Sequence, residues 1–196
     1  MELRIYDARD GITKLGPGVR FGIWVQGCQR RCPGCMTPDS RPLDGGRLTD
    51  THTLAQDVIS SGRTGVTISG GEPFLQATAL GELISEIRQQ RDVGVIVYTG
   101  YTYEQLRQGI PDNAAKLLDL CDMIIDGEYI DELNDGKNHS GSSNQRAIPL
   151  TDRYAQFASE VGTRPAEVEF FYDEENLCMI GVPPRALLEG IKKKKL

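Results

Sequence analysis

The sequence has no long hydrophobic run, no excess of positive charge and no internal repeat. No apolar stretch approaches the roughly 20 residues that cross a bilayer, and the N-terminus lacks the pattern of a signal peptide. We therefore expect a cytoplasmic protein with no membrane partner. The net charge of −6 argues against general nucleic-acid binding. No low-complexity linker divides the chain, which favours a single domain.

The length sets a limit on the architecture. At 196 residues, the chain can bury a substantial core but is shorter than the roughly 250 residues of a complete eight-fold β/α barrel. Its 39% hydrophobic and 26% charged residues are ordinary for a globular protein. We expect residues 1–150 to form the core and residues 151–196 to form an extension packed on it within the same domain. The lysines at 192–195 are assigned no function.

Three of the five cysteines lie close together, in the stretch G-C-Q-R-R-C-P-G-C. Thiolates select iron–sulfur clusters, zinc or copper(I), so Cys28, Cys32 and Cys35 could hold three corners of a cubane. Cys121 and Cys178 lie far downstream in apolar surroundings, as buried structural thiols do. A cubane bound in this way would leave one iron without a protein ligand and open to a substrate.

A zinc knuckle is the alternative interpretation of the same three cysteines. A structural zinc site is closed by four ligands, so a distant residue such as His52 or His139 would have to complete it. Neither histidine is given any other role. Five cysteines with three in a ligand-like group suit a reducing cytoplasm better than a secreted disulfide framework.

Predicted strands and helices alternate at short spacing through the first two-thirds of the chain. This alternation implies right-handed βαβ units, so we expect an α/β fold built as an open partial barrel of parallel strands. The predicted strands are 20–26, 65–69, 93–98 and 123–125. The predicted helices are one through residues 54–59 capped by Thr49 or Asp50, one near 76–90, a short one after a capping box of Thr102 and Gln105, and one near 113–120.

The last third of the chain departs from this alternation. Residues 131–147 are polar and predict a loop. Two apolar segments, 168–172 and 177–182, flank the polar residues 173–176 and predict a β-hairpin extension. Pro183-Pro184 would then begin a short final helix.

The spacing C-x-x-x-C-x-x-C resembles that of the radical S-adenosylmethionine (SAM) superfamily. The phrase from Gly16 to Cys35 is similar to the opening of glycyl-radical-enzyme activating proteins. Later phrases are similar to those of the activating proteins of class III (anaerobic) ribonucleotide reductase: Y-T-G-Y at 98–101, D-G at 126–127 and G-S-S-N-Q-R at 141–146. This resemblance covers roughly residues 14–148.

The resemblance implies a radical SAM enzyme with a [4Fe-4S] cluster on Cys28, Cys32 and Cys35, which would be both the metal ligands and the catalytic centre. SAM would bind the remaining iron, and a flavodoxin or ferredoxin type reductant would deliver one electron. Cleavage of SAM would give a 5′-deoxyadenosyl radical. That radical would remove hydrogen from a glycine of a partner glycyl radical enzyme, here an anaerobic ribonucleotide reductase. The open side of a partial barrel would admit the partner's loop.

The resemblance also suggests residues that bind SAM. Gly70 and Gly71 would let the backbone approach the ammonium group of SAM, and Glu72 would supply a charge-assisted partner. A plain turn with a glutamate at the start of a helix is the alternative. The hydroxyl of Thr99 and the carboxylate of Asp126 could bond the ribose or methionine groups of SAM. Both could equally belong to strand-end turns that satisfy their own backbone.

The polar segment 131–146 has two open interpretations. Its G-S-S-N-Q-R stretch is either a loop of hydrogen-bond donors near the cofactor or partner, or a polar surface turn. We expect the segment to lie beside the SAM pocket and to help receive the partner's glycine loop, with Arg146 taking part.

Two departures from the resemblance bear on the partner. Met36-Thr37 follows the third cysteine, where the relatives commonly have an aromatic residue or histidine and then asparagine. The segment after residue 150 is also longer than a minimal reductase activator needs. A radical SAM enzyme that modifies a peptide or small molecule is therefore the first alternative. A non-catalytic iron–sulfur or zinc-binding protein is the second.

Overall fold

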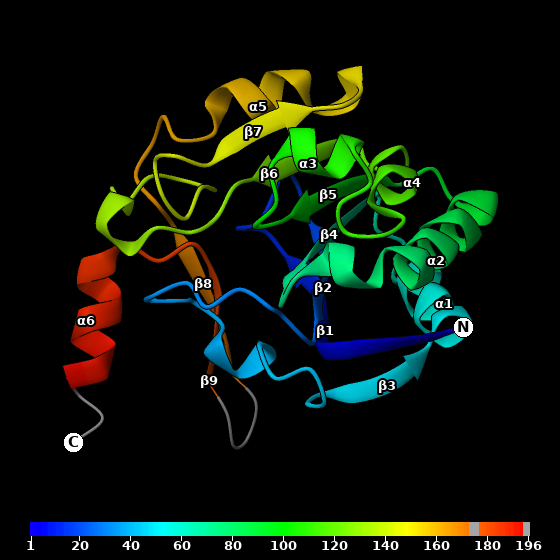
Figure 1. The fold of residues 1–196 in the computed structure, drawn as a ribbon, viewed down its shortest axis with the longest axis horizontal. Coiled ribbons are helices and arrows are strands. Elements are labelled where there is room, and N and C mark those ends of the chain that lie inside the picture. Colours follow the sequence, from blue (N-terminus) through cyan, green and yellow to red (C-terminus); the bar gives the residue numbers. More distant parts are fainter. Residues whose placement is uncertain (173–176, 194–196) are drawn as a thin grey trace.

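The computed structural model describes residues 1–172 and 177–193 (Figure 1). The predicted hairpin turn at 173–176 and the lysines at 194–195 lie outside the described residues. Within the described part, no helix is both long and apolar enough to cross a membrane. The strands are β1 (Glu2–Ile12), β2 (Arg20–Val25), β3 (Arg47–Asp50), β4 (Gly65–Gly70), β5 (Gly94–Tyr98), β6 (Met123–Asp126), β7 (Arg146–Pro149), β8 (Val168–Tyr172) and β9 (Leu177–Gly181). The helices are α1 (Thr51–Ser61), α2 (Ala77–Gln90), α3 (Tyr103–Arg107), α4 (Ala114–Leu118), α5 (Ala155–Glu160) and α6 (Arg185–Lys193).

The centre of the main sheet is parallel, as the alternation of strands and helices predicts. The strand order is β3-β1-β2-β4-β5-β6-β7. Strands β2, β4, β5 and β6 pair in parallel, with Ile23 opposite Ile68 and Ile68 opposite Val97. The carboxyl ends of these four strands therefore lie along one edge of the sheet, and the loop with the three cysteines begins there.

The sides of the sheet are antiparallel, so the prediction of parallel strands alone is wrong there. Strand β1 pairs antiparallel with both β2 and β3, and β7 pairs antiparallel with β6. Strand β1 escapes prediction because its register shifts between Ile5 and Asp7 and between Asp10 and Ile12 break the alternation of side chains. Strand β7 starts at Arg146, inside the segment predicted to be a loop. The sheet is thus mixed but mostly parallel.

Helices α1, α2 and α4 lie on one side of the sheet (Figure 1). The apolar face of α2, including Leu80, Leu83 and Ile87, is fully buried in the main core cluster together with residues of the sheet. The start of α1 is capped as predicted, because the Asp50 carboxylate accepts hydrogen bonds from the backbone N–H groups of residues 52 and 53. The predicted capping box between Thr102 and Gln105 at the start of α3 is confirmed.

The predicted β-hairpin is confirmed as a separate two-stranded sheet, β8-β9. It is attached through a second core cluster made by Ile12, Leu15 and Trp24 together with Ile180 and Val182. Trp24 is 8% exposed and belongs to the core. The predicted final helix is α6, which follows the two prolines. The hairpin and α6 therefore lie on the side of the sheet away from α1 and α2 (Figure 1).

Arg20 is a buried cation at the start of β2, only 1% exposed. All of its hydrogen-bond acceptors are neutral. They are Thr67 Oγ1 at 2.6 Å, the Val66 carbonyl at 2.7 Å, the Tyr154 hydroxyl at 2.8 Å, the Gly94 carbonyl at 3.1 Å and the Pro17 carbonyl at 3.4 Å. The guanidinium group thereby ties the amino-terminal ends of the parallel strands to the segment just before α5.

Candidate functional site

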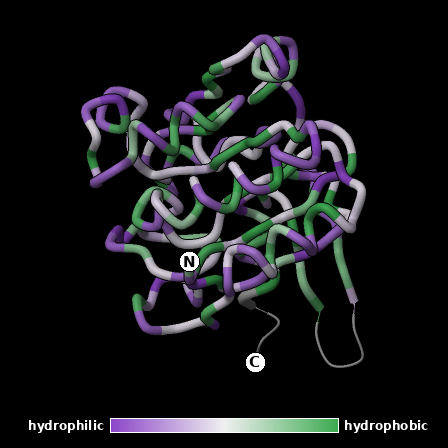
Figure 2. The backbone as a smooth tube through the Cα atoms, turned by 90° about the vertical axis from the view of Figure 1, so that its right-hand side faces the viewer, coloured by the Kyte–Doolittle hydropathy of each residue, from purple (hydrophilic) through white to green (hydrophobic). Residues whose placement is uncertain are grey.

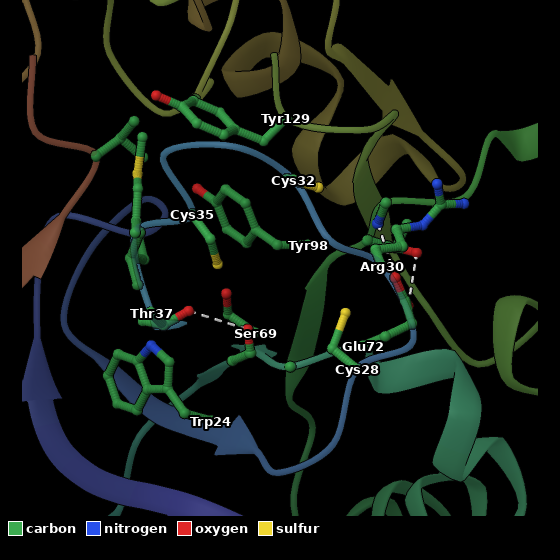
Figure 3. Close-up of a pocket in the computed structure, with 18 of the residues that line it drawn as sticks. Trp24, Cys28, Arg30, Cys32, Cys35, Thr37, Ser69, Glu72, Tyr98 and Tyr129 are labelled. Carbon is green, nitrogen blue, oxygen red and sulfur yellow. Dashed lines mark hydrogen bonds between the residues drawn. The ribbon is translucent and has the colours of Figure 1, made fainter. Parts of the chain in front are cut away.

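A cavity of about 200 Å³ lies at the carboxyl ends of the parallel strands. Four parts of the chain line it: the cysteine loop after β2, the ends of β4 and β5, the loop after β6, and the residues at the end of β9. Figure 3 shows Cys28, Cys35, Ser69, Glu72 and Tyr98 around this space. The cavity therefore brings together segments that are more than 150 residues apart in the sequence.

The cysteine loop is held by backbone hydrogen bonds that do not use the thiols. The Gly27 N–H donates to the Ser40 carbonyl at 2.8 Å, and the Cys28 N–H donates to the Arg41 carbonyl at 2.9 Å. From the neighbouring strand end, the Glu72 N–H donates to the Gly27 carbonyl at 2.9 Å. These bonds fix the start of the loop against both its own continuation and the end of β4.

Cys28, Cys32 and Cys35 are all partly buried and all line the cavity. Burial raises the pKa of Cys28. Burial, together with Glu128, raises the pKa of Cys32 to about 11, and the Cys32 thiol lies 3.5 Å from Glu128 Oε1. At neutral pH these two thiols therefore carry protons that a metal would have to displace.

The arrangement of the thiols bears on the choice between zinc and a cubane. Among the described residues, no group of three or more Cys, His, Asp or Glu side chains converges on a point that could hold one ion. A zinc knuckle needs a fourth ligand beside the three cysteines, whereas a cubane takes each thiolate on a different iron. His52 bonds Glu86 on the surface of α1, and neither it nor His139 lines this cavity. The donor set fits an iron–sulfur cluster better than a zinc knuckle.

The two glycines at the end of β4 pack directly against the cysteine loop. A Cβ atom on Gly71 would lie 2.3 Å from the Gly27 oxygen and 2.9 Å from the Ser40 oxygen. A Cβ atom on Gly70, whose φ is +102°, would lie 2.5 Å from the Val25 oxygen. The sequence predicts that these glycines let the backbone approach SAM. In the structure both glycines pack against neighbouring backbone and both also line the cavity. Their contact with SAM remains a prediction.

Glu72 is a buried carboxylate, 2% exposed, with a full set of protein partners. It accepts hydrogen bonds from the Thr99 hydroxyl at 2.8 Å, the Gly100 N–H at 2.8 Å and the Phe74 N–H at 3.1 Å. Burial raises the pKa of Glu72, and these hydrogen bonds together with the charge of Arg30 oppose that rise. A cation entering the cavity would favour the ionised carboxylate further.

Thr99 and Asp126 differ in their relation to the cavity. Thr99 lines it, with its hydroxyl bonded to Glu72. Asp126 is fully buried and is absent from the lining, although Gly127 is part of it. The Asp126 carboxylate accepts from Arg146 Nε at 2.9 Å, from a second Arg146 nitrogen at 2.5 Å and from the Tyr103 N–H at 2.7 Å. Contacts of Thr99 and Asp126 with SAM remain predictions.

The polar segment after β6 reaches the cavity through two residues, Gly141 and Gln145. The Gln145 side chain links this part of the segment to the end of β6. Its Oε1 accepts from the Gly141 N–H at 2.7 Å, and its Nε2 donates to the Gly127 carbonyl at 2.8 Å. Arg146 does not line the cavity, and its guanidinium group contacts Asp126 and Glu104 instead. A role of the segment in receiving a partner remains a prediction.

Arg146→Ala is expected to lower the free energy of unfolding by about 2–3 kcal/mol, because the buried Asp126 carboxylate would keep only the Tyr103 N–H as a partner. Arg146 also holds the pKa of Glu104 at about 2. As the pH falls from about 4.5 towards 2 and Glu104 takes up a proton, the wild-type protein should therefore lose the stability that comes from the Arg146–Glu104 pair, whereas the variant lacks this pair and should show no such loss. Urea unfolding at pH 7 and pH 3 measures both effects.

Arg164→Ala is a matched control for this substitution. Its guanidinium pairs with Glu160 on the surface, where an ion pair contributes little, so stability should change by less than about 0.5 kcal/mol. If the Arg146→Ala protein were as stable as wild type but activated a partner less well, Arg146 would instead be assigned to partner binding.

Three lining residues to which the sequence analysis gives no role each have a buried polar atom without a partner among the described residues. These atoms are Arg30 Nε, Arg41 Nε and the Tyr98 hydroxyl. Arg30 also stacks 4.5 Å from the centre of the Tyr101 ring and pairs with Glu128 at 3.3 Å. Unpaired buried polar atoms are rare in proteins, so these three suit a polar ligand in the cavity. The signals available in the sequence are the position of Arg30 between two cysteines and of Tyr98 within Y-T-G-Y.

The end of β9 supplies a wall of the cavity that no motif indicates. Met179, Ile180, Gly181, Val182 and Pro183 all line it. The two remaining cysteines lie outside the lining. Cys121 is buried, 3% exposed, as predicted for a structural thiol, whereas Cys178 is only partly buried beside the second core cluster.

Comparison with known proteins matches the part of the chain that holds the three cysteines. Residues 14–148 match the family described as a 4Fe-4S single cluster domain. The chain is similar to the anaerobic ribonucleoside-triphosphate reductase-activating protein of Enterobacteria phage T4, with 31% identity over 143 residues that cover 70% of this chain and 88% of that protein. It is similar to the protein of the same name from Escherichia coli (strain K12), with 30% identity over 144 residues that cover 66% of this chain and 88% of that protein. It also resembles the pyruvate formate-lyase-activating enzyme of Clostridium pasteurianum, with 31% identity over 120 residues that cover 57% of this chain and 50% of that protein.

Proposed function

Because this chain belongs to the 4Fe-4S single cluster domain family, and within it to the radical SAM activating enzymes of glycyl radical enzymes, we propose that it activates an anaerobic ribonucleotide reductase. Its cofactors are a [4Fe-4S] cluster and SAM, which together supply a 5′-deoxyadenosyl radical able to take hydrogen from a glycine α-carbon. The observation that carries the proposal is the single cavity shared by the three cysteines and the Gly70-Gly71-Glu72 strand end.

Cys28, Cys32 and Cys35 are the proposed cluster ligands. Each would bind iron as a thiolate, and the backbone bonds at the start of the loop position Cys28 for this role. Gly70 and Gly71 serve the same site indirectly, because their lack of side chains lets the end of β4 support the loop.

The proposed SAM site lies beside the cysteines in the same cavity. Glu72, fixed by three hydrogen bonds, favours an ammonium group nearby, with Thr99 holding the carboxylate in position. Arg30, Arg41 and Tyr98 each offer a buried polar atom that has no partner in the described part of the chain, which suits the carboxylate and hydroxyl groups of SAM. Asp126 would reach SAM only after exchanging a bond with Arg146.

The proposed architecture is an open partial (β/α) barrel of the radical SAM type. In support of it, four parallel strands end at the cavity and helices cover their outer face. Residues 1–150 are proposed as the core and residues 151–196 as an extension of the same domain, supported by the packing of β8-β9 on the second core cluster. A flavodoxin or ferredoxin type protein is the proposed reductant, and the cytoplasm suits the unpaired cluster thiols.

Anaerobic reconstitution tests the function. Protein loaded with iron and sulfide, then mixed with SAM and dithionite, should release 5′-deoxyadenosine. Addition of the anaerobic ribonucleotide reductase from the same organism should give a glycine-centred radical by electron paramagnetic resonance.

Two results would overturn the proposal. Stoichiometric zinc without a SAM-responsive iron spectrum would favour a non-catalytic metal-binding protein. Release of 5′-deoxyadenosine without a glycine radical on the reductase would favour modification of a peptide or small molecule.

A further inference from the structure

The β8-β9 hairpin has one face on the sheet and the other face free. On the attached face, the Glu169 carboxylate accepts from the Thr13 N–H at 2.7 Å and the Thr13 hydroxyl at 2.8 Å. Phe171 on the same face lies under Arg9, whose guanidinium carbon is 5.2 Å from the ring centre. Ile180, also on this face, is 3% exposed. The hairpin is therefore firmly attached, and its orientation relative to the cavity is set.

The free face of the hairpin is apolar and exposed. Because side chains alternate along a strand, Phe170 and Tyr172 of β8 lie on this face with Leu177 and Met179 of β9, and the pairs are Phe170 with Met179 and Tyr172 with Leu177. Phe170 is 53% exposed, Leu177 is 65% exposed and Tyr172 is 77% exposed. Figure 2 shows the hairpin extending from the body of the protein. We call these four residues the hairpin face.

The hairpin face is continuous with the cavity. Met179 belongs to both, since it lines the cavity and pairs with Phe170 across the hairpin. From Met179, the face runs outward through Phe170 to Leu177 and Tyr172. A polypeptide that enters the cavity from this side would therefore lie on apolar side chains before it reached the cysteines.

We infer that the hairpin face is the docking surface for the partner glycyl radical enzyme, and that it binds apolar side chains flanking the partner's glycine. This inference rests on the proposed function, because only a protein substrate requires a second polypeptide at the cavity. Exposed aromatic residues are enriched among the residues that dominate binding at protein interfaces. Residues beyond 148 lie outside the matched domain, so the hairpin adds a contact for a particular partner to a general cofactor site.

The test is a set of substitutions on the hairpin face, made in the full chain with its cluster reconstituted. Tyr172→Ser and Leu177→Ser remove exposed side chains singly, and the triple variant with Phe170→Ser removes the face except for Met179. Leu48→Ser is the matched control, because Leu48 is 52% exposed on the edge strand β3 and belongs to neither the hairpin face nor the cavity lining. Thermal unfolding checks that each variant is folded.

The expected result is a change in partner binding alone. The triple variant should raise the Kd for the anaerobic ribonucleotide reductase by about tenfold or more, with smaller increases in the single variants. 5′-Deoxyadenosine release without the partner should match wild type in every variant. At low partner concentration the glycine radical signal should fall in proportion to binding, and the Leu48→Ser protein should behave as wild type.

Two outcomes would overturn the inference. The first is wild-type partner affinity in the folded triple variant. The second is a change from dimer to monomer in sedimentation with unchanged partner affinity, which would assign the face to a second copy of this chain. Failure of the wild-type protein itself to form a glycine radical would instead contradict the proposed function, so the two failures are distinguishable.

Discussion

Cys32→Ala protein, reconstituted without oxygen, is expected to lose its iron–sulfur cluster and with it all SAM cleavage. The wild-type protein should bind about four irons and four sulfides. Cys32 lines the cavity together with Cys28 and Cys35, so its loss would leave the cluster with two of its three proposed ligands. Iron and sulfide analysis, with chromatographic detection of 5′-deoxyadenosine, measures both losses.

Cys121→Ala is the matched control for this experiment. Cys121 is 3% exposed, and its thiol donates to the Leu117 carbonyl within the main core, away from the cavity lining. The control should lose some stability but keep its iron and its SAM cleavage. Equal iron loss in folded Cys121→Ala, or a full cluster in Cys32→Ala, would contradict the assignment of ligands.

Gly71→Val is expected to lose cluster binding and SAM cleavage together. The added Cβ would overlap the Gly27 oxygen at 2.3 Å and the Ser40 oxygen at 2.9 Å, both of them backbone atoms of the cysteine loop and its continuation. The loop must shift, which should cost about 1–3 kcal/mol of stability and displace Cys28. Thermal unfolding and iron content after reconstitution measure these effects.

This expectation differs from the one that the sequence supports. From the motif alone, Gly71→Val should keep the cluster and weaken only SAM binding, because the glycine is interpreted as space for the cofactor. Iron content distinguishes the two expectations. A Gly71→Val protein with the iron content of wild type and weak SAM binding would show that the glycine makes space for the cofactor. Gly81→Ala in α2 is the control, because its Cβ would meet only Leu120 Cδ1 at an ordinary 3.6 Å. It should raise stability by about 0.4–1 kcal/mol.

The parts of the site that could be predicted are those whose chemistry is contiguous in the sequence. The three thiols of the cysteine loop and the Gly70-Gly71-Glu72 turn can be recognised in the sequence by residue type and spacing. Each follows a short apolar strand, and the ends of parallel strands meet at one edge of a sheet. The structure accordingly brings both into one cavity.

The parts that could not be predicted depend on which strands and side chains pair with one another across long stretches of sequence. Nothing near Asp126 in the sequence says that its carboxylate bonds Arg146, because the pairing follows from β7 lying antiparallel to β6. Strand β7 has only four residues and forms an edge of the sheet, so it is too short to show the alternation by which strands are recognised. The cavity wall from Met179 to Pro183 requires the hairpin to pack over β1, which no local pattern encodes.

The backbone bonds at the start of the cysteine loop make the loss of a ligand distinguishable from the loss of the fold. The Gly27 N–H and the Cys28 N–H donate to the Ser40 and Arg41 carbonyls, and the Gly27 carbonyl accepts from the Glu72 N–H. None of these three bonds uses a thiol, so a substitution that removes a thiol leaves all of them in place. Small zinc domains behave in the opposite way, since they unfold when their ion is lost. Iron that is missing from a folded cysteine variant of this protein therefore reports a missing ligand and not an unfolded chain.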